Sequence, residues 1–203
     1  TSERGRRVYE RTLMFVFLLA MRELFPDTRV RINFAVGAGL VTSAEGMNFG
    51  PLTVASIKAR MREIVSSDYP LERKRLDVDD AIEFFAHDGQ MDKVRLLKWR
   101  QFTYFDVYRH DNYVDYFYGE MAPSTGYASV FDVQAHPLGL MLLRPWRENP
   151  NEPAPHEFKP KLAAVFTESD EWARLMRCSV VADLNDMVQN GEIRTLIRVN
   201  EAL

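Results

Sequence analysis

The sequence predicts an α+β fold, a two-layer antiparallel sheet with packed helices. Two observations lead to this prediction. Strand-like and helix-like patterns fall into separate runs, and the strand-like stretches alternate apolar with polar side chains. With 46% hydrophobic and 27% charged residues, the 203-residue chain has the composition of a globular protein, which excludes a disordered one.

Helices and strands can be placed from the period of the apolar residues. The stretch from Val8 to Leu24 is apolar on nearly all sides, which predicts a buried helix. Further helices are predicted at 53–67, 79–87, 90–99, 168–176 and 182–190, and from 192 onward, with Gly191 as a cap. Strands are predicted at 29–36, 40–44, 70–77, 102–109, 113–118, 127–134 and 138–144. In the first strand, the alternation places four apolar side chains on one face: Val30, Ile32, Phe34 and Val36.

Prolines divide the chain. Five of them between residues 145 and 160 predict a loop or linker. We therefore expect a domain over 1–145, a Pro-rich loop over 146–160, and a C-terminal helical segment over 161–203. The chain starts at Thr1 and stops at Leu203 within a helical pattern, so we expect a segment of a longer protein.

Several kinds of chemistry are disfavoured. None of the histidines (87, 110, 136 and 156) lies within four residues of another or of Cys178, so no pair has metal-ligand spacing. Gly37-Ala38-Gly39 lacks the third glycine of a dinucleotide fingerprint and predicts a hairpin turn with glycines at positive φ. No Gly-Lys-Ser or Gly-Lys-Thr occurs, so the chain has no P-loop lysine. The longest apolar run, Leu13 to Met21, is too short to cross a membrane.

Three features allow two interpretations each. Ser124-Thr125-Gly126 is typical of a turn, although the hydroxyls could contact a ligand. Arg177 beside Cys178 could activate the thiol, and the alternative is an inert cysteine. Eight aromatic residues between 102 and 118 could form a base-stacking platform, but the acidic residues among them favour a role as core or pocket lining.

Three stretches resemble one family in order and spacing. They are Phe17 to Pro26, Ile57 to Ile64, and Val114 to Pro123, and they resemble the second additional, editing-type domain of threonyl-tRNA synthetase, shared with alanyl-tRNA synthetase. The resemblance covers about residues 8 to 145 and implies the α+β fold of that domain.

Other stretches are similar to large bacterial uridine kinase-like (nucleoside kinase) proteins, which join a TGS domain, a synthetase-like domain and a P-loop kinase. These stretches are Asp115 to Tyr127, Gly89 to Leu97, and Asp183-Leu184-Asn185. The resemblance implies that residues 1–9 leave the TGS domain and that Leu203 approaches the kinase domain.

The chain departs from the synthetase pattern at its reactive positions. In that family, two helix histidines face a cysteine and a third histidine. The resemblance places Arg11 and Phe15 at the helix positions, and Phe117 and Met121 at the other two. Phenylalanine and methionine cannot replace an imidazole base or a thiolate ligand, so we expect no synthetase-type deacylation. Either a cleft persists, with Arg11 at its edge and possible ligand contacts from Tyr118, Ser124 and Thr125, or it has become hydrophobic core.

These observations predict a non-catalytic accessory module, structural, regulatory or ligand-sensing, with no metal and no cofactor in this chain. ATP and Mg²⁺ are expected only for the kinase domain outside it, which would phosphorylate uridine or cytidine. The expected partners are the protein's own TGS and kinase domains and a nucleoside or nucleotide. A membrane is not expected, nucleic acid is disfavoured, and the expected location is the cytoplasm.

Two rival functions use other residues. An RNA-binding module would present a basic stripe, formed by Arg60, Arg62, Arg73, Lys74 and Arg75. An editing-type hydrolase with relocated residues would use His110 with Asp111, although neighbours on a strand point to opposite faces.

Overall fold

The computed structural model describes residues 2–202, which form two compact units. The first unit contains the chain up to Lys74 together with Val107–Phe158, and the second contains Arg75–Asp106 together with the chain from Lys159 onward. Each unit is thus assembled from separate parts of the sequence. The predicted division at residues 145 and 160 stays a prediction, and its outermost positions, Thr1 and Leu203, lie outside the described residues.

The fold is α+β with two antiparallel sheets and packed helices, which confirms the predicted class. The first unit holds a four-stranded sheet of order β1-β2-β7-β6. Its elements are α1 (Glu3–Leu24), β1 (Val30–Val36), β2 (Gly39–Ala44), α2 (Pro51–Ser66), β5 (Tyr113–Asp115), the 3₁₀ helix η1 (Thr125–Ala128), β6 (Asp132–His136) and β7 (Gly139–Leu143).

A second sheet has the order β3-β4-β5. Its strands β3 (Glu72–Asp77) and β4 (Tyr104–His110) run through the unit boundaries, and β3 is exposed along most of its length. The remaining elements belong to the second unit: α3 (Val78–His87), α4 (Met91–Leu97), α5 (Pro160–Leu175), α6 (Val181–Gln189) and α7 (Ile193–Ala202).

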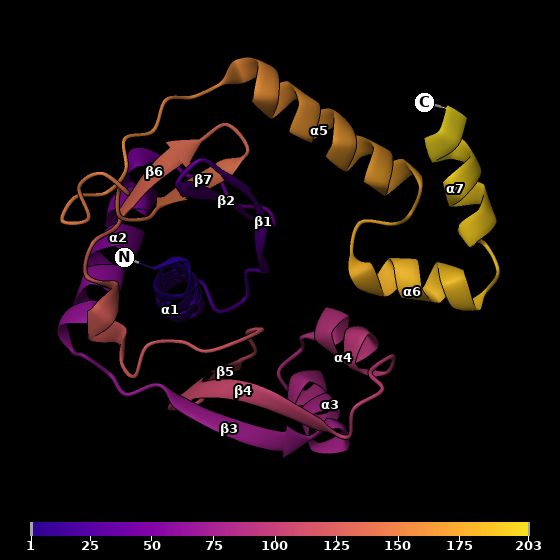
Figure 1. Ribbon diagram of the computed structural model, residues 1–203, viewed down its shortest axis with the longest axis horizontal. Coiled ribbons are helices and arrows are strands. Elements are labelled where there is room, and N and C mark those ends of the chain that lie inside the picture. Colours follow the sequence, from indigo (N-terminus) through magenta and orange to yellow (C-terminus); the bar gives the residue numbers. More distant parts are fainter. Residues whose placement is uncertain (1, 203) are drawn as a thin grey trace. The chain divides into compact units, whose positions relative to one another are not determined.

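Helix α1 lies at the centre of the first unit's core. Figure 1 shows it end-on beside the four-stranded sheet. Its buried side chains contact Leu40 of β2, Leu140 of β7 and Ile57 of α2 within one hydrophobic cluster. Tyr9 secures the exposed end of the helix, because its hydroxyl donates to the Val130 carbonyl and accepts from the Val130 N–H, each at 2.8 Å. Burial raises the pKa of this phenol to about 12.

The first strand corrects one prediction. Val30 and Ile32 pack on the cluster around α1, whereas Phe34 and Val36 pack on a second cluster with Val41. The register of β1 against β2 shifts between Ile32 and Phe34. A bulge of this kind inserts one residue and turns the following side chains to the other face. The predicted single apolar face is therefore divided between the two sides of the sheet.

Four further predictions need correction. The strand predicted over 127–134 begins only at Asp132, because the preceding residues form η1. The strand predicted over 113–118 ends at Asp115, whose carboxylate accepts hydrogen bonds from the Tyr116 N–H and the Tyr113 hydroxyl. The helix predicted from 168 begins at Pro160, since proline is well tolerated in the first turn. In the 37–39 turn, only Gly37 has the positive φ expected of both glycines.

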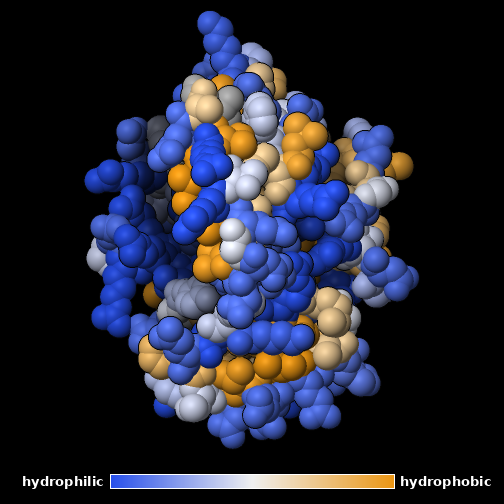
Figure 2. Space-filling model, turned by 90° about the vertical axis from the view of Figure 1, so that its right-hand side faces the viewer, coloured by the Kyte–Doolittle hydropathy of each residue, from blue (hydrophilic) through white to orange (hydrophobic). Residues whose placement is uncertain are grey.

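The helices of the second unit expose much of their apolar surface. Neither α5 nor α7 buries a residue, and α6 buries only Ala182. On the face drawn in Figure 2, hydrophobic residues form several separate groups among hydrophilic ones. No helix within residues 2–202 is long and apolar enough to span a membrane.

The buried face of α2 supplies a stability test. Ile57 is fully buried, and Leu52 on the same helix is 85% exposed. We expect Ile57→Ala to lower the free energy of unfolding by about 2–5 kcal/mol, because it removes packing and leaves a cavity. The matched control Leu52→Ala is expected to change it by less than about 0.5 kcal/mol. Urea denaturation followed by circular dichroism measures both, and equal effects would contradict this description of the core.

Candidate functional site

The synthetase-like positions meet at one end of the core of the first unit. Phe15 of α1 is fully buried, and its ring centroid lies 6.3 Å from that of Phe117 and 5.2 Å from that of Tyr113. Met121 is buried in the same hydrophobic cluster. Three of the four positions named from the resemblance therefore pack together. Their packing favours the hydrophobic-core alternative over an open cleft.

Arg11 lies at the edge of this cluster. Its Nη1 donates to the Glu120 carbonyl at 3.2 Å, and its guanidinium lies against Gly119. Gly119 has φ of +114°, which other residues rarely adopt, and a β-carbon there would sit 2.8 Å from Arg11 Cζ and displace the guanidinium. The carboxylate of Glu120 accepts from Arg4 at 2.7 Å, and this hydrogen bond lowers the pKa of Glu120. Arg11 as a ligand contact stays a prediction.

Hydrogen bonds hold the chain after Gly119 against α1. The Thr12 hydroxyl accepts from the Ala122 N–H and donates to the Val8 carbonyl, both at 2.9 Å. The Tyr108 hydroxyl accepts from the Met121 N–H at 2.9 Å. Two backbone donors beside the former reactive positions are therefore satisfied by protein side chains.

The other predicted ligand contacts differ in their surroundings. Tyr118 is largely exposed. Ser124 donates to Asp68, and the same carboxylate accepts from the Gly126 N–H. Thr125 is fully buried, where its hydroxyl donates to the Ile64 carbonyl at 2.8 Å and accepts from the Tyr69 N–H at 2.9 Å. Ser124 and Thr125 thus join the turn to the end of α2, which matches the turn interpretation.

The predicted basic stripe is partly neutralised. Arg60 forms hydrogen-bonded ion pairs with Glu23 at 2.6 Å and Glu63 at 2.7 Å, and these hydrogen bonds raise the pKa of Arg60. Lys74 lies 3.5 Å from Glu72. These pairings reduce the charge that the stripe could offer to phosphates.

The two residues proposed for a relocated hydrolase, His110 and Asp111, lie close to each other but not within hydrogen-bond distance. His110 Nε2 lies 3.6 Å from Asp111 Oδ2, which the strand argument did not anticipate. Asp111 has left the strand and has φ of +48°, so its side chain need not point to the opposite face. The His110 ring is stacked on Tyr69 at 4.1 Å. The carboxylate is mostly exposed, and such a pair orients an imidazole weakly.

The cysteine and the possible metal ligands were also located in the structure. Burial, with Asp183 nearby, raises the pKa of the Cys178 thiol, opposite to the shift that activation requires. Among residues 2–202, no three His, Cys, Asp or Glu side chains are grouped so that they could hold a metal ion.

The aromatic block divides between core and surface. Phe105 and Tyr108 are buried, and Tyr113 and Phe117 pack against the core. Phe102 and Tyr104 are exposed instead. Core lining therefore describes only part of the block.

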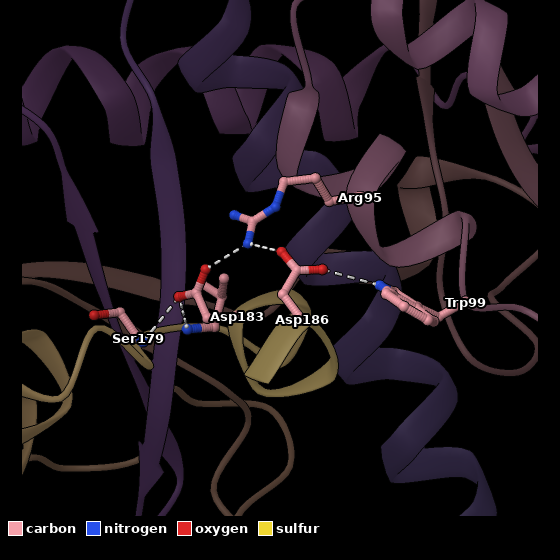
Figure 3. A network of polar contacts seen from close by, with 6 residues as sticks. Arg95, Trp99, Ser179, Asp183 and Asp186 are labelled. Atoms are coloured by element: carbon pink, nitrogen blue, oxygen red, sulfur yellow. Dashed lines mark hydrogen bonds and ion pairs between the residues drawn. The ribbon is translucent and has the colours of Figure 1, made fainter. Parts of the chain in front are cut away.

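A polar network in the second unit joins α4 to α6 (Figure 3). One nitrogen of Arg95, Nη2, donates to Asp183 at 2.8 Å and to Asp186 at 2.5 Å. The Trp99 indole N–H donates to the other oxygen of Asp186 at 3.2 Å. Asp183 also accepts from the backbone N–H groups of Ser179 and Val180, so it caps α6. Arg95, Lys98, Trp99 and Asp186 line a hollow of about 350 Å³.

Two residues of this network lie in stretches that were compared with kinase-like proteins. Arg95 lies within Gly89 to Leu97, and Asp183 opens the short stretch that ends at Asn185. The sequence analysis identified both stretches but could not predict that they contact each other, because Arg95 and Asp183 are 88 residues apart. Val180 is the N-cap residue of α6, and Asp183 lies three positions after it. An acidic residue at this spacing is a sequence signal for a helix cap.

Comparisons with known proteins agree with the synthetase resemblance. The chain is 33% identical over 132 residues to the threonine–tRNA ligase of Carboxydothermus hydrogenoformans, covering 64% of this chain and 21% of the relative. It is 38% identical over 117 residues to that of Rickettsia akari, covering 55% and 18%, and 30% identical over 127 residues to that of Syntrophomonas wolfei, covering 62% and 20%. No family model matches.

These relatives define a threonyl-tRNA synthetase-like domain within the chain. The chain spans about a fifth of the length of the curated relatives it matches. None of the three is named as a kinase.

Thr12 provides a test of the hydrogen bonds that hold the chain after Gly119 against α1. We expect Thr12→Val to cost about 1–3 kcal/mol of unfolding free energy, since the buried Ala122 N–H loses its acceptor. Thr195→Val on the exposed side of α7 is the control and is expected to have little effect. Urea denaturation measures both. A stable Thr12→Val protein would show that this hydrogen bond is dispensable.

The α4–α6 network predicts a pH-dependent signal. The hydrogen bond from Arg95 lowers the pKa of Asp186. A carboxylate with a lowered pKa stabilises the fold above its unfolded-state pKa, and this contribution is lost as the pH falls through the lowered value. We expect the Trp99 indole N–H resonance to titrate with a midpoint below the ordinary pKa of an aspartate side chain.

Asp186→Asn should abolish this titration, and the Trp172 indole resonance on α5 serves as the control for general unfolding. If the Trp99 resonance titrated unchanged in the variant, the Trp99–Asp186 hydrogen bond would be contradicted.

Proposed function

We propose that this chain is a non-catalytic accessory module of a larger protein, built on an editing-type fold. The observation that carries this proposal is the burial of Phe15 against Phe117, at positions where the resemblance expects an imidazole and a thiolate. Hydrocarbon side chains offer neither a base nor a metal ligand. The positions that would perform deacylation are instead part of the packing.

The parent of this module is proposed to be a uridine kinase-like protein. Support comes from the resemblance of Asp115 to Tyr127, Gly89 to Leu97, and Asp183 to Asn185 to such proteins. Phosphoryl transfer from ATP, with Mg²⁺, to uridine or cytidine would then belong to a C-terminal domain outside this chain. The module would contact its own TGS and kinase domains and position or regulate the latter, or sense a nucleoside or nucleotide.

Deacylation of mischarged tRNA tests the non-catalytic assignment. We expect no hydrolysis above the uncatalysed rate with this chain, because its candidate positions hold no general base. The control is the chain with Arg11→Ala, which should give the same background. Hydrolysis that rises with the concentration of the chain would contradict the proposal.

The kinase parent needs a separate experiment. We expect the full-length protein to transfer phosphate from ATP to uridine or cytidine and this chain to transfer none. A full-length protein without this activity would reject the kinase parent and leave the deacylation result standing.

A thermal-shift screen tests ligand sensing. At a hundred times its dissociation constant, a nucleoside or nucleotide should stabilise the chain by about 2.7 kcal/mol. A shift that Arg11→Ala removes would identify the Arg11 edge as the binding site. No shift with any compound would reject sensing and leave positioning of the kinase domain as the role.

RNA binding is the second candidate function. It is supported by the relatives named threonine–tRNA ligase and by aromatic and arginine side chains that lie together on the surface of the second unit.

A further inference from the structure

An exposed group of aromatic and arginine side chains lies in the second unit. Phe102 is 64% exposed and Tyr104 is 40% exposed, and their ring centroids are 6.4 Å apart. Two guanidinium groups accompany them. Arg75 Cζ lies 4.2 Å from the Tyr104 centroid, and Arg100 Cζ lies 5.8 Å from that of Phe102. We name these four residues the aromatic strip.

The charges around the strip favour an anionic ligand. Arg75 pairs with Asp106, where Nε and Oδ1 are 3.2 Å apart, yet 62% of the Arg75 side chain is exposed. Within residues 2–202, Arg100 Nε has no hydrogen-bond partner, and its guanidinium lies 4.7 Å from the Phe105 ring. Lys98 adds an exposed cation two residues before Arg100. Arg75, Lys98 and Arg100 are the cations of this region and Asp106 pairs with Arg75, while the whole chain has a net charge of −3.

Exposed aromatic rings beside guanidinium groups match the chemistry of unpaired nucleotides. A base stacks on an aromatic ring or on a guanidinium plane, and the cations contact the neighbouring phosphates. An apolar peptide would have to desolvate the arginines without compensating them. A base paired within a duplex would present no stacking face.

We propose that the aromatic strip binds single-stranded nucleic acid, with bases stacked on Phe102 and Tyr104 and phosphates held by Arg75 and Arg100. This inference deepens the RNA-binding candidate by naming its surface and its ligand class. It also differs from the basic stripe predicted from sequence, because only Arg75 is common to both.

Fluorescence anisotropy with labelled oligouridylate and oligodeoxythymidylate at low salt tests the proposal. We expect Phe102→Ala and Tyr104→Ala each to raise Kd about 5- to 150-fold, the range for losing one stacked base. Tyr127→Ala is the matched control, since Tyr127 is an exposed aromatic of the first unit at 62% exposure, and it should leave Kd unchanged.

Salt provides a second readout. We expect Kd to rise with salt, and Arg75→Ala to reduce the slope of log Kd against log salt by about 0.7, the value for one contact to a single strand. A duplex of the same sequence should bind more weakly than the single strand. Whether ribose or deoxyribose is preferred follows from the two single-stranded probes.

Three outcomes would overturn the proposal. The first is that neither single strand binds at low salt. The second is that Tyr127→Ala raises Kd as much as Phe102→Ala and Tyr104→Ala do. The third is that neither Phe102→Ala nor Tyr104→Ala changes Kd. If tRNA bound while the aromatic variants had no effect, the RNA-binding candidate would survive and the strip would be rejected as its surface. If no nucleic acid bound, both would fail, and the strip would become a candidate for a protein contact.

Discussion

The burial of α1 is the constraint on which the first unit depends. A helix that is apolar on nearly every side must be covered all round, because each exposed methylene sacrifices favourable transfer energy. The covering surfaces come from β2, β7 and α2 and from the chain after Gly119. Each of these elements packs on α1 or is hydrogen-bonded to it.

This constraint also decides the chemistry of the former reactive positions. Phe15 lies on a buried helix, and its ring packs in one hydrophobic cluster with Phe117 and Met121. Thr12 and Tyr108 then satisfy the backbone donors of the neighbouring chain. The arrangement that could hold reactive side chains around a cleft here holds a packed core, with the guanidinium of Arg11 at its edge.

The second unit is organised differently. Helices α5 and α7 bury no residue, and α6 is joined to α4 through the carboxylates of Asp183 and Asp186. Ion pairs at partly exposed positions contribute modestly and depend on pH and salt. The first unit therefore has its stability in packing, whereas the contacts joining α6 to α4 are polar. The aromatic strip lies in this second unit, where apolar and cationic side chains share the surface.

The sequence by itself determined the fold class and most of the helices, because period and polarity are local properties of the chain. The resemblance also predicted which four residues stand at the positions that are reactive in the synthetase family. Tertiary structure decided the rest. The bulge after Ile32 sends Phe34 to another face, and Arg95 finds Asp183 across 88 residues. It also separated the aromatic block into buried Phe105 and exposed Tyr104, because strand neighbours point to opposite faces and only the packing determines which face meets the core.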